Sequence, residues 1–397
     1  MYPRKKLSEI LTILINGKSC KQISEPIGDK ITRIETISQG YINSEKVGYF
    51  QLTPEDRKKY SINKGDILFS HINSIEHIGK IAIAEKDFSD LFHGMNLLLL
   101  RTDSNILEPK YLYIVLYDYY KRGYWKPICK KAINQASLNQ GNLNDLPIPL
   151  PPLPTQTAIV AKLDAAFANI DKQIALLRGN IEDLKRVRES VLNESFSGDF
   201  PVKKLSEVCE KTQTWNPEIL GESSFEYIDI ASIDNKNYEI AELKEIAGNN
   251  APSRAKKLVE FQDVLFATTR PNLKNIAVVN FTKQYLTCST GFCVLRSRLN
   301  TLNYKYLFYF LISDILAIEI VPFIRGAGYP AISDKDLFSL QIPLPPLSTQ
   351  QSIVAHLDSV FASTETLTKG YQAQITDLET MKQSLLQEAF EGRLVKE

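Results

Sequence analysis

The sequence has 397 residues, 44% of them hydrophobic and 23% charged, which is typical of a soluble globular protein. This length predicts two or three domains, and a formal net charge of +1 means that nucleic-acid binding would have to depend on local basic clusters. No apolar run approaches the ~18 residues of a membrane span, and "MYPRKKLSEI" at the N-terminus is not a signal-peptide pattern. Five scattered cysteines predict a reducing, cytoplasmic environment without a disulfide framework.

The first globular half, residues 1–154, is expected to be mostly β-structure with some helix. "GDILFS" and "KIAIAE" predict strands, and "PKYLYIVLYDYYKR" predicts an aromatic amphipathic helix whose tyrosines favour core packing over base stacking. The loop between the strands could read base edges, and that loop and "KRGYWKPICKK" could contact phosphates, although such lysines also occur on ordinary solvated faces. The base-reading candidates are His71, Asn73 and Ser74, and the phosphate candidates are Lys80, Lys121, Arg122, Lys126, Lys130 and Lys131.

A proline-rich segment, "IPLPPLPTQTAIVAKLDAAFA", begins at Ile148 and leads into a long helix over 155–198. Because proline fixes φ, the segment predicts a stiff joint, with Thr155 as the helix N-cap. The alternative is a ligand for a polyproline-binding domain, but such motifs usually lie in disordered tails. Apolar residues at seven-residue intervals predict a coiled-coil seam made of Leu163, Ile170, Leu177, Leu184 and Val191.

The same organisation occurs a second time. "IPLPPLSTQQSIVAHLDSVFA" starts at Ile342, 194 residues further on, and is identical at 15 of 21 positions; "KKLSE" also recurs, and "QDVLFA" echoes "GDILFS". A second domain over 199–348 and a second helix over 349–397, with Thr349 as N-cap, are therefore expected. The predicted seam of this helix is Leu357, Thr364, Tyr371, Leu378 and Leu385, with Ile353, Val360, Leu367 and Met381 in the adjoining row.

Neither long helix can bury its apolar stripe alone, so the two are expected to pack together. Since the chain leaves the first domain along one helix and returns along the other, this packing is antiparallel. The predicted fold class is α+β: two similar globular domains of mixed sheet and helices, separated by a two-helix antiparallel coiled coil with pseudo-twofold symmetry.

The loops that follow the corresponding strands differ between the halves. The second half has "TTRPNLKN" where the first has "HINSIEHIGK", as two modules reading different bases would require, although any solvent-exposed loop can diverge. The base-reading candidates here are Thr269, Arg270 and Asn272, and the phosphate candidates are Arg254, Lys256, Lys257 and Lys274.

No pattern assigns catalysis or metal binding to the chain. There is no phosphate-binding loop or methyltransferase motif, and "GAGYPA" at Gly326 has Pro330 where a dinucleotide-binding helix would begin. Cys288 and Cys293 have no histidine nearby, which favours two thiols in or beside a strand over a zinc site. We therefore expect no catalytic residues, no metal and no cofactor in this chain.

Two related domains joined by a two-helix rod could bind two separated sites on DNA, because the geometry of the DNA double helix fixes the distance between half-sites. The rival hypothesis is a coiled-coil scaffold that bridges two protein partners without nucleic acid, which the near-neutral charge favours slightly.

The repeated motifs "PLPPLPTQTAIVAKLD" and "PLPPLSTQQSIVAHLD" resemble the specificity subunit of type I restriction-modification enzymes, and the resemblance covers essentially the whole chain. It implies two target recognition domains that each read half of a split DNA sequence. It also implies two adenine methyltransferase (modification) subunits and restriction or translocase subunits as partners, with S-adenosylmethionine, ATP and Mg bound in those partners. One departure is Thr155-Gln156 and Thr349-Gln350 where the family usually has Glu-Gln, which we expect to affect helix capping little.

Overall fold

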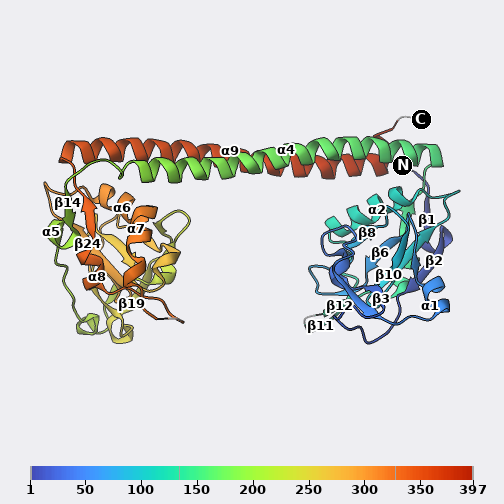
Figure 1. The fold of residues 1–397 in the computed structure, drawn as a ribbon, viewed down its shortest axis with the longest axis horizontal. Coiled ribbons are helices and arrows are strands. Elements are labelled where there is room, and N and C mark those ends of the chain that lie inside the picture. Colours follow the sequence, from blue (N-terminus) through green and yellow to red (C-terminus); the bar gives the residue numbers. More distant parts are fainter. Residues whose placement is uncertain (1, 134, 327, 396–397) are drawn as a thin grey trace. The chain divides into compact units, whose positions relative to one another are not determined.

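A computed structural model describes residues 2–133, 135–326 and 328–395. The chain divides into two compact units, Met1–Leu176 with Ala373–Glu397, and Leu177–Gln372. Each unit contains one globular domain and one end of each of two long helices, α4 (Leu153–Glu194) and α9 (Leu347–Glu391) (Figure 1). The chain therefore passes from one unit to the other within two uninterrupted helices.

The first domain is built on two four-stranded sheets, with strand orders β2-β10-β6-β8 and β4-β3-β9-β5. Strands β6 and β10 are apolar and almost entirely buried, which explains why they form the centre of their sheet. The strands are β1 (Arg4–Lys6), β2 (Leu11–Asn16), β3 (Asp29–Thr32), β4 (Val47–Phe50), β5 (Ser61–Ile62), β6 (Ile67–Ser70), β7 (Ile72–Asn73), β8 (Ile81–Ile83), β9 (Phe88–Phe92), β10 (Leu97–Thr102), β11 (Lys130–Ala132), β12 (Gln135–Ser137) and β13 (Pro147–Pro149). The helices are α1 (Pro54–Lys59), α2 (Pro109–Lys121), α3 (Gln140–Asn144) and the 3-10 turns η1 (Leu7–Glu9) and η2 (Ile34–Ile37).

The second domain repeats this topology, with strand orders β15-β24-β21-β22 and β19-β16-β23-β20. Its strands are β14 (Val202–Lys204), β15 (Cys209–Glu210), β16 (Ser224–Ile228), β17 (Ile233–Asp234), β18 (Glu239–Ile240), β19 (Lys244–Ala247), β20 (Ala255–Leu258), β21 (Val264–Ala267), β22 (Ile276–Val278), β23 (Thr287–Ser289), β24 (Phe292–Ser297) and β25 (Gln341–Pro343). Its helices are α5 (Leu205–Val208), α6 (Tyr304–Ile312), α7 (Asp314–Glu319), α8 (Asp334–Ser339), η3 (Pro217–Leu220), η4 (Ile230–Ser232), η5 (Gly248–Asn250), η6 (Pro271–Leu273) and η7 (Val321–Phe323). Both domains contain one parallel strand pair among antiparallel ones, so the mixed α+β class and the duplication are confirmed.

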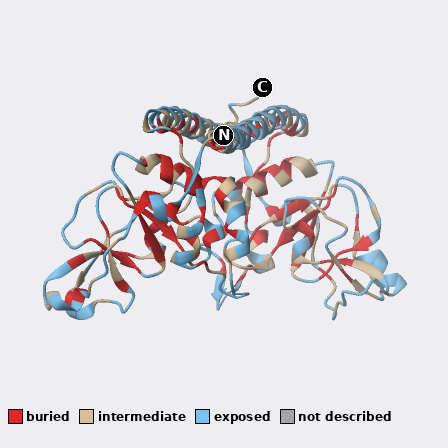
Figure 2. Cartoon of the chain, turned by 60° about the vertical axis from the view of Figure 1, so that its left-hand side comes forward, coloured by how far each residue is buried: buried red, intermediate tan, exposed pale blue. Residues whose placement is uncertain are grey.

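The aromatic helices α2 and α6 pack in the cores of their domains, as their apolar stripes predict (Figure 2). Tyr111 and Tyr306 are both 0% exposed, and each hydroxyl donates to a carbonyl of the proline joint, Pro149 or Pro343, at 2.9 Å. Within the described residues no single helix is long and apolar enough to cross a membrane; Tyr304–Ile312 and Asp314–Phe323 pass that test of length and composition only as a pair bent by 60°.

The proline joints are strands that lead directly into the long helices. In each joint a three-residue strand pairs with the segment that begins its domain, β13 with β1 and β25 with β14. The helices begin at Leu153 and Leu347, so the prediction that Thr155 and Thr349 are N-caps is wrong: both lie inside the first turn. The adjacent glutamines make the contact that sequence analysis missed.

Gln156 and Gln350 are 0% exposed and form the same three hydrogen bonds. Gln156 accepts from the Glu108 backbone N–H at 2.9 Å and donates from Nε2 to the Ile106 and Pro151 carbonyls at 3.0 and 2.8 Å. Gln350 accepts from Asn303 N–H at 2.9 Å and donates to the Thr301 and Pro345 carbonyls at 3.0 and 2.9 Å. Each glutamine thus fastens the start of a long helix to the loop before the aromatic helix and to the joint.

The ends of both long helices complete the domain cores. In the first domain, Ile159 and Leu163 near the start of α4 share one core with Leu386 and Ala389 near the end of α9. In the second domain the roles are exchanged, and the core includes Leu357 of α9, Leu192 of α4 and Phe196 just beyond α4. Each domain core therefore needs the beginning of one helix and the end of the other.

The two helices pair antiparallel within each unit. In the first unit, Asp171 forms an ion pair with Lys382, and Lys162 donates to the Leu394 carbonyl at 3.1 Å. In the second unit, the guanidinium of Arg188 lies 4.1 Å from the ring centroid of Phe361. Low residue numbers in α4 thus meet high numbers in α9.

The helix seam follows the predicted seven-residue spacing in part. Leu163, Ile170 and Leu357 are buried, while most of the other predicted seam residues are half-buried: Leu177, Leu184, Val191, Tyr371, Leu378 and Leu385. Leu367 and Met381, expected in the adjoining row, are 47% and 52% exposed, so their assignment was wrong. Thr364, a predicted seam residue, is also buried. It is followed at intervals of eleven residues by buried Ile375 and Leu386, which the heptad did not include, and eleven residues are close to three turns of a straight α-helix.

Acidification is expected to destabilise the first domain through His93. This side chain is 0% exposed, its Nδ1 has no hydrogen-bond partner among the residues that the structure describes, and burial lowers its pKa from 6.5 to about 4. Between pH 6.5 and 4, His93 is therefore protonated in the unfolded chain but stays neutral in the folded domain. The free energy of unfolding consequently declines as the pH falls below 6.5, by about 2 kcal/mol at pH 5. Denaturant unfolding followed by the fluorescence of Trp125, in a Trp215→Phe background, measures this loss at pH 7 and pH 5. His93→Leu should remove most of the difference, and an equal loss in that variant would contradict the assignment.

Candidate nucleic-acid interface

The loop after β6 lies against a hairpin in the first domain. Strands β7, β12 and β11 form a three-stranded sheet in which Asn73 is opposite Ala136, and the Leu138 N–H donates to the His71 carbonyl at 2.8 Å. Strand β11 carries Lys130 and Lys131, both exposed. The fold thereby brings two groups of predicted DNA-contacting residues, far apart in sequence, onto one small sheet.

The second domain has an equivalent arrangement. Ala331 bridges both Thr269 and Arg325, and the Ile332 N–H donates to the Thr268 carbonyl at 2.9 Å, as Leu138 does to His71. By this correspondence Arg270 stands where Asn73 stands in the first domain. Arg325, which forms one of these bridges, and Tyr329, in the bend before Ala331, were not among the predicted site residues; their signal was their place just before the proline joint. Ala327, within the "GAGYPA" segment, lies outside the described residues.

The three base-reading candidates of the first domain are half-buried and engaged in local contacts. Asn73 donates from Nδ2 to the Ser70 hydroxyl at 3.0 Å and accepts from the Ser74 backbone N–H at 2.8 Å. Burial lowers the pKa of His71, which favours the neutral ring. These side chains shape the loop, and reaching a base edge would require Asn73 to exchange its internal partners.

The phosphate candidates of the first domain fall into two groups. Lys80 donates to the Ser38 carbonyl at 2.9 Å, Arg122 pairs with Asp118 at 2.8 Å, and the ammonium of Lys121 lies 5.5 Å from the ring centroid of Tyr117. Lys126, Lys130 and Lys131 are exposed. The second group is better placed to meet a DNA backbone.

Lys257 is a structural residue in the second domain. Its side chain is 13% exposed, and Nζ donates to the Phe292 carbonyl at 2.6 Å and to Asp334 at 2.5 Å. Because its charge is already neutralised below the surface, Lys257 is less free for the predicted phosphate contact. Lys256 donates to Asn216 at 2.9 Å while remaining half-exposed, and Arg254 is exposed.

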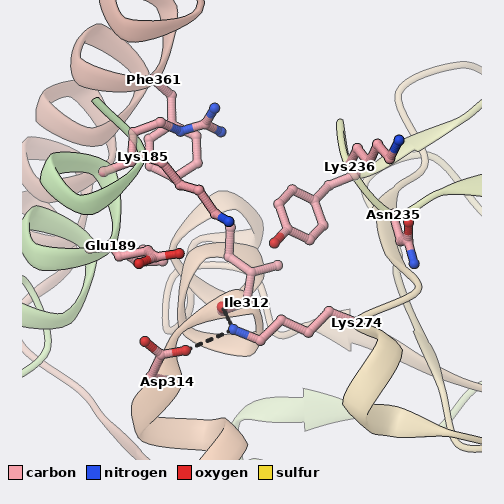
Figure 3. A pocket seen from close by; sticks show the side chains of 11 residues that line it. Lys185, Glu189, Asn235, Lys236, Lys274, Ile312, Asp314 and Phe361 are labelled. Carbon is pink, nitrogen blue, oxygen red and sulfur yellow. Dashed lines mark hydrogen bonds and ion pairs between the residues drawn. The ribbon is translucent and has the colours of Figure 1, made fainter. Parts of the chain in front are cut away.

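Lys274 anchors the loop of the second domain and lies at the edge of a pocket of about 320 Å³ (Figure 3). Its ammonium donates to the Ile312 carbonyl and to Asp314, both at 2.9 Å. Asp314 in turn accepts from Asn193 of α4 at 3.1 Å, and the Lys274 hydrogen bond lowers its pKa. Lys274 therefore couples the loop to α7 and, through Asp314, to α4, which leaves it less free for a phosphate than predicted.

Arg270 and Asn272 are exposed on this loop, and Thr269 is half-buried. The Arg270 guanidinium carbon lies 5.2 Å from the ring centroid of Tyr329, a residue that is 75% exposed. This is an accessible planar cation backed by an aromatic ring, a geometry suited to nucleic acid.

No group of three or more His, Cys, Asp or Glu side chains able to hold a metal occurs in residues 2–133, 135–326 or 328–395. Cys288 and Cys293 lie in β23 and β24 and are 0% exposed, which confirms them as strand residues. Burial raises the pKa of both thiols, so they remain protonated and unreactive.

Comparison with known proteins agrees with this architecture. Residues 2–186 and 198–377 each match the family described as "Type I restriction modification DNA specificity domain". The chain is 37% identical to the MjaX specificity subunit of a type I restriction enzyme from Methanocaldococcus jannaschii, over 90% of this chain and 86% of the relative. It is 24% identical to the EcoDI specificity subunit of Escherichia coli, over 73% and 71% of the two chains.

Two solved structures share the fold. One, from a study of complex assembly and conformational transition of the type I R-M system, has a TM-score of 0.79 at 21% identity and covers 99% of this chain and 98% of its own. The other is the HsdS subunit from Thermoanaerobacter tengcongensis, with a TM-score of 0.62 at 22% identity and coverage of 99% and 97%.

Proposed function

The chain belongs to the family of type I restriction modification DNA specificity proteins, and we propose that each of its two domains reads one half of a split DNA site. The observation that carries this proposal is a pair of domains with one topology whose equivalent loops present different side chains, Asn73 and Arg270. Asparagine pairs with adenine and arginine with guanine in the major groove. The two loops would therefore favour different bases, provided that Asn73 exchanges its internal partners Ser70 and Ser74 for a base. The scaffold hypothesis, which omits nucleic acid, is not favoured by the family assignment.

In this proposal the chain recognises DNA, and the partner subunits carry out methylation and cleavage. Two adenine methyltransferase (modification) subunits would bind S-adenosylmethionine, and restriction or translocase subunits would use ATP and Mg. The family assignment supports double-stranded DNA and other restriction-modification subunits as partners. Helices α4 and α9, within which the chain passes between the units, would set the spacing between the half-sites.

The complex of this chain with its modification subunit should protect two short DNA segments separated by an unprotected gap. Lys126, Lys130, Lys131 and Arg254 are exposed cations that would contact phosphates, so the affinity should fall steeply as salt rises, by roughly ten-fold or more between 50 and 200 mM. Footprinting and a salt titration measure the two effects. One continuous protected stretch would refute the split site, and binding indifferent to salt would return the scaffold hypothesis to favour.

A further inference from the structure

Arg270 adopts a backbone conformation that is unusual for its residue type. Its φ and ψ are 51° and 57°, in the left-handed region that residues other than glycine, asparagine and aspartate rarely occupy. The conformation is held by its N–H, which donates to the Pro330 carbonyl at 2.7 Å, and by its carbonyl, which accepts from Leu273 at 2.9 Å. Strained residues of this kind cluster at binding sites, where the surrounding structure maintains them.

The loop is fixed at both ends. Lys274 also has a positive φ, 50°, and its ammonium is held by Asp314 and the Ile312 carbonyl. Between these two left-handed residues, the 3-10 turn η6 exposes Asn272 and Leu273. The loop is therefore ordered before any ligand arrives, which reduces the entropy lost on binding.

Tyr329 supports the guanidinium from one side. Its ring centroid lies 5.2 Å from the Arg270 guanidinium carbon, while the neighbouring Arg325 turns to Asp336 at 3.4 Å. A guanidinium backed by a ring loses rotational freedom yet keeps its N–H edge for a ligand in the same plane. In the first domain the amide of the equivalent Asn73 forms hydrogen bonds with Ser70 and Ser74. A side chain held by a ring with its N–H edge free is therefore specific to the second domain.

Building on the proposed function, we infer that Arg270 reads a guanine in the half-site of the second domain and that Tyr329 is its positioning residue. The N–H edge of arginine matches O6 and N7 of guanine, two acceptors that no other base offers together in the major groove. A preformed loop and a ring-backed guanidinium would present that edge in one orientation.

The test maps methylated sites in genomic DNA from cells that express the chain with the modification subunit of its own system. In Arg270→Asn, asparagine tolerates the left-handed backbone, so the loop should persist while the guanine preference at one position of one half-site falls by roughly ten- to a hundred-fold. The other half-site should be unchanged. Tyr329→Phe should retain the preference, and Tyr329→Ala should weaken it at the same position.

Arg325→Ala is the matched control, since it removes a positive charge from the adjoining segment but leaves the Arg270–Tyr329 pair. It should lower methylation evenly and keep the guanine preference. A wild-type site without two separated halves would refute the proposed function itself. A split site that Arg270→Asn leaves unchanged would overturn only this inference, as would equal losses from Tyr329→Phe and Tyr329→Ala.

Discussion

Gln350→Glu is expected to destabilise the second domain by about 2–5 kcal/mol, the cost of leaving two buried carbonyl groups without donors. The amide donates to the Thr301 and Pro345 carbonyls in a site that is 0% exposed. A carboxylate would retain the acceptor for the Asn303 N–H but would place negative charge against both carbonyl oxygens. Gln156→Glu should have the same effect on the first domain, because its contacts are the same.

Hydrogen exchange of β24 and β10, followed by mass spectrometry against denaturant, measures the two domains separately in one sample. Gln351→Glu is the matched control: the same substitution one residue later, on an exposed position, should change stability little. The buried carboxyl of the Gln350 variant should have a raised pKa, so its defect should be smallest below about pH 4.3 and should grow as the pH rises. A stable variant, or one whose defect grows on acidification, would show that the glutamine does not hold the joint.

Removing one helical turn from both α4 and α9 is expected to change the DNA sequence that the complex methylates. A turn is ~5 Å of helix, so the gap between the half-sites should shorten by about one to two base pairs while the half-sites stay the same. Sequencing of methylated sites reads the gap directly. If both helices lose a turn and the gap is unchanged, the helices do not set the spacing.

Removing the turn from α4 alone is the informative companion variant. The core of the second domain needs Leu192 of α4 beside Leu357 of α9, and that of the first needs Leu163 of α4 beside Leu386 of α9. One shortened helix cannot satisfy both cores, so we expect loss of stability and of methylation at every gap length. Full activity in this variant would show that the pairing of the helices is dispensable.

The duplicated architecture could be predicted because its signal is repeated and periodic. Three elements have strong sequence patterns, and each is present once in each half of the chain. They are the proline joint, the apolar strand (β6 and β21) and the aromatic helix (α2 and α6). The prediction of Thr155 and Thr349 as N-caps was wrong because it used only the local preference for threonine at helix N-caps. The tertiary contacts of Gln156 and Gln350 decide where each helix begins. The prediction that Leu367 and Met381 adjoin the seam was wrong because positions seven residues apart rotate progressively around a straight helix, away from its buried face.

The candidate site was only partly accessible to sequence reasoning. The equivalent loops could be matched from the sequence, and the strand pairings then place Asn73 and Arg270 at corresponding positions in the two domains. The roles of Lys257 and Lys274 depended on Asp334 and Asp314, which are 77 and 40 residues away in sequence, so composition alone could not separate structural lysines from free ones. Tyr329 was missed because its relation to Arg270 exists only once the hairpin has closed.

The exchange of helix ends between the cores has a consequence for synthesis on the ribosome. Leu192 and Phe196 are made before the second domain, whereas Leu386 and Ala389, which the first domain requires, are translated only after the second domain. The part of the first domain's core that α9 covers therefore stays exposed until α9 is synthesised, which takes roughly 10–40 s at 5–20 residues per second. Translation order and completion order are thus opposed: the domain that emerges first is the last to finish folding.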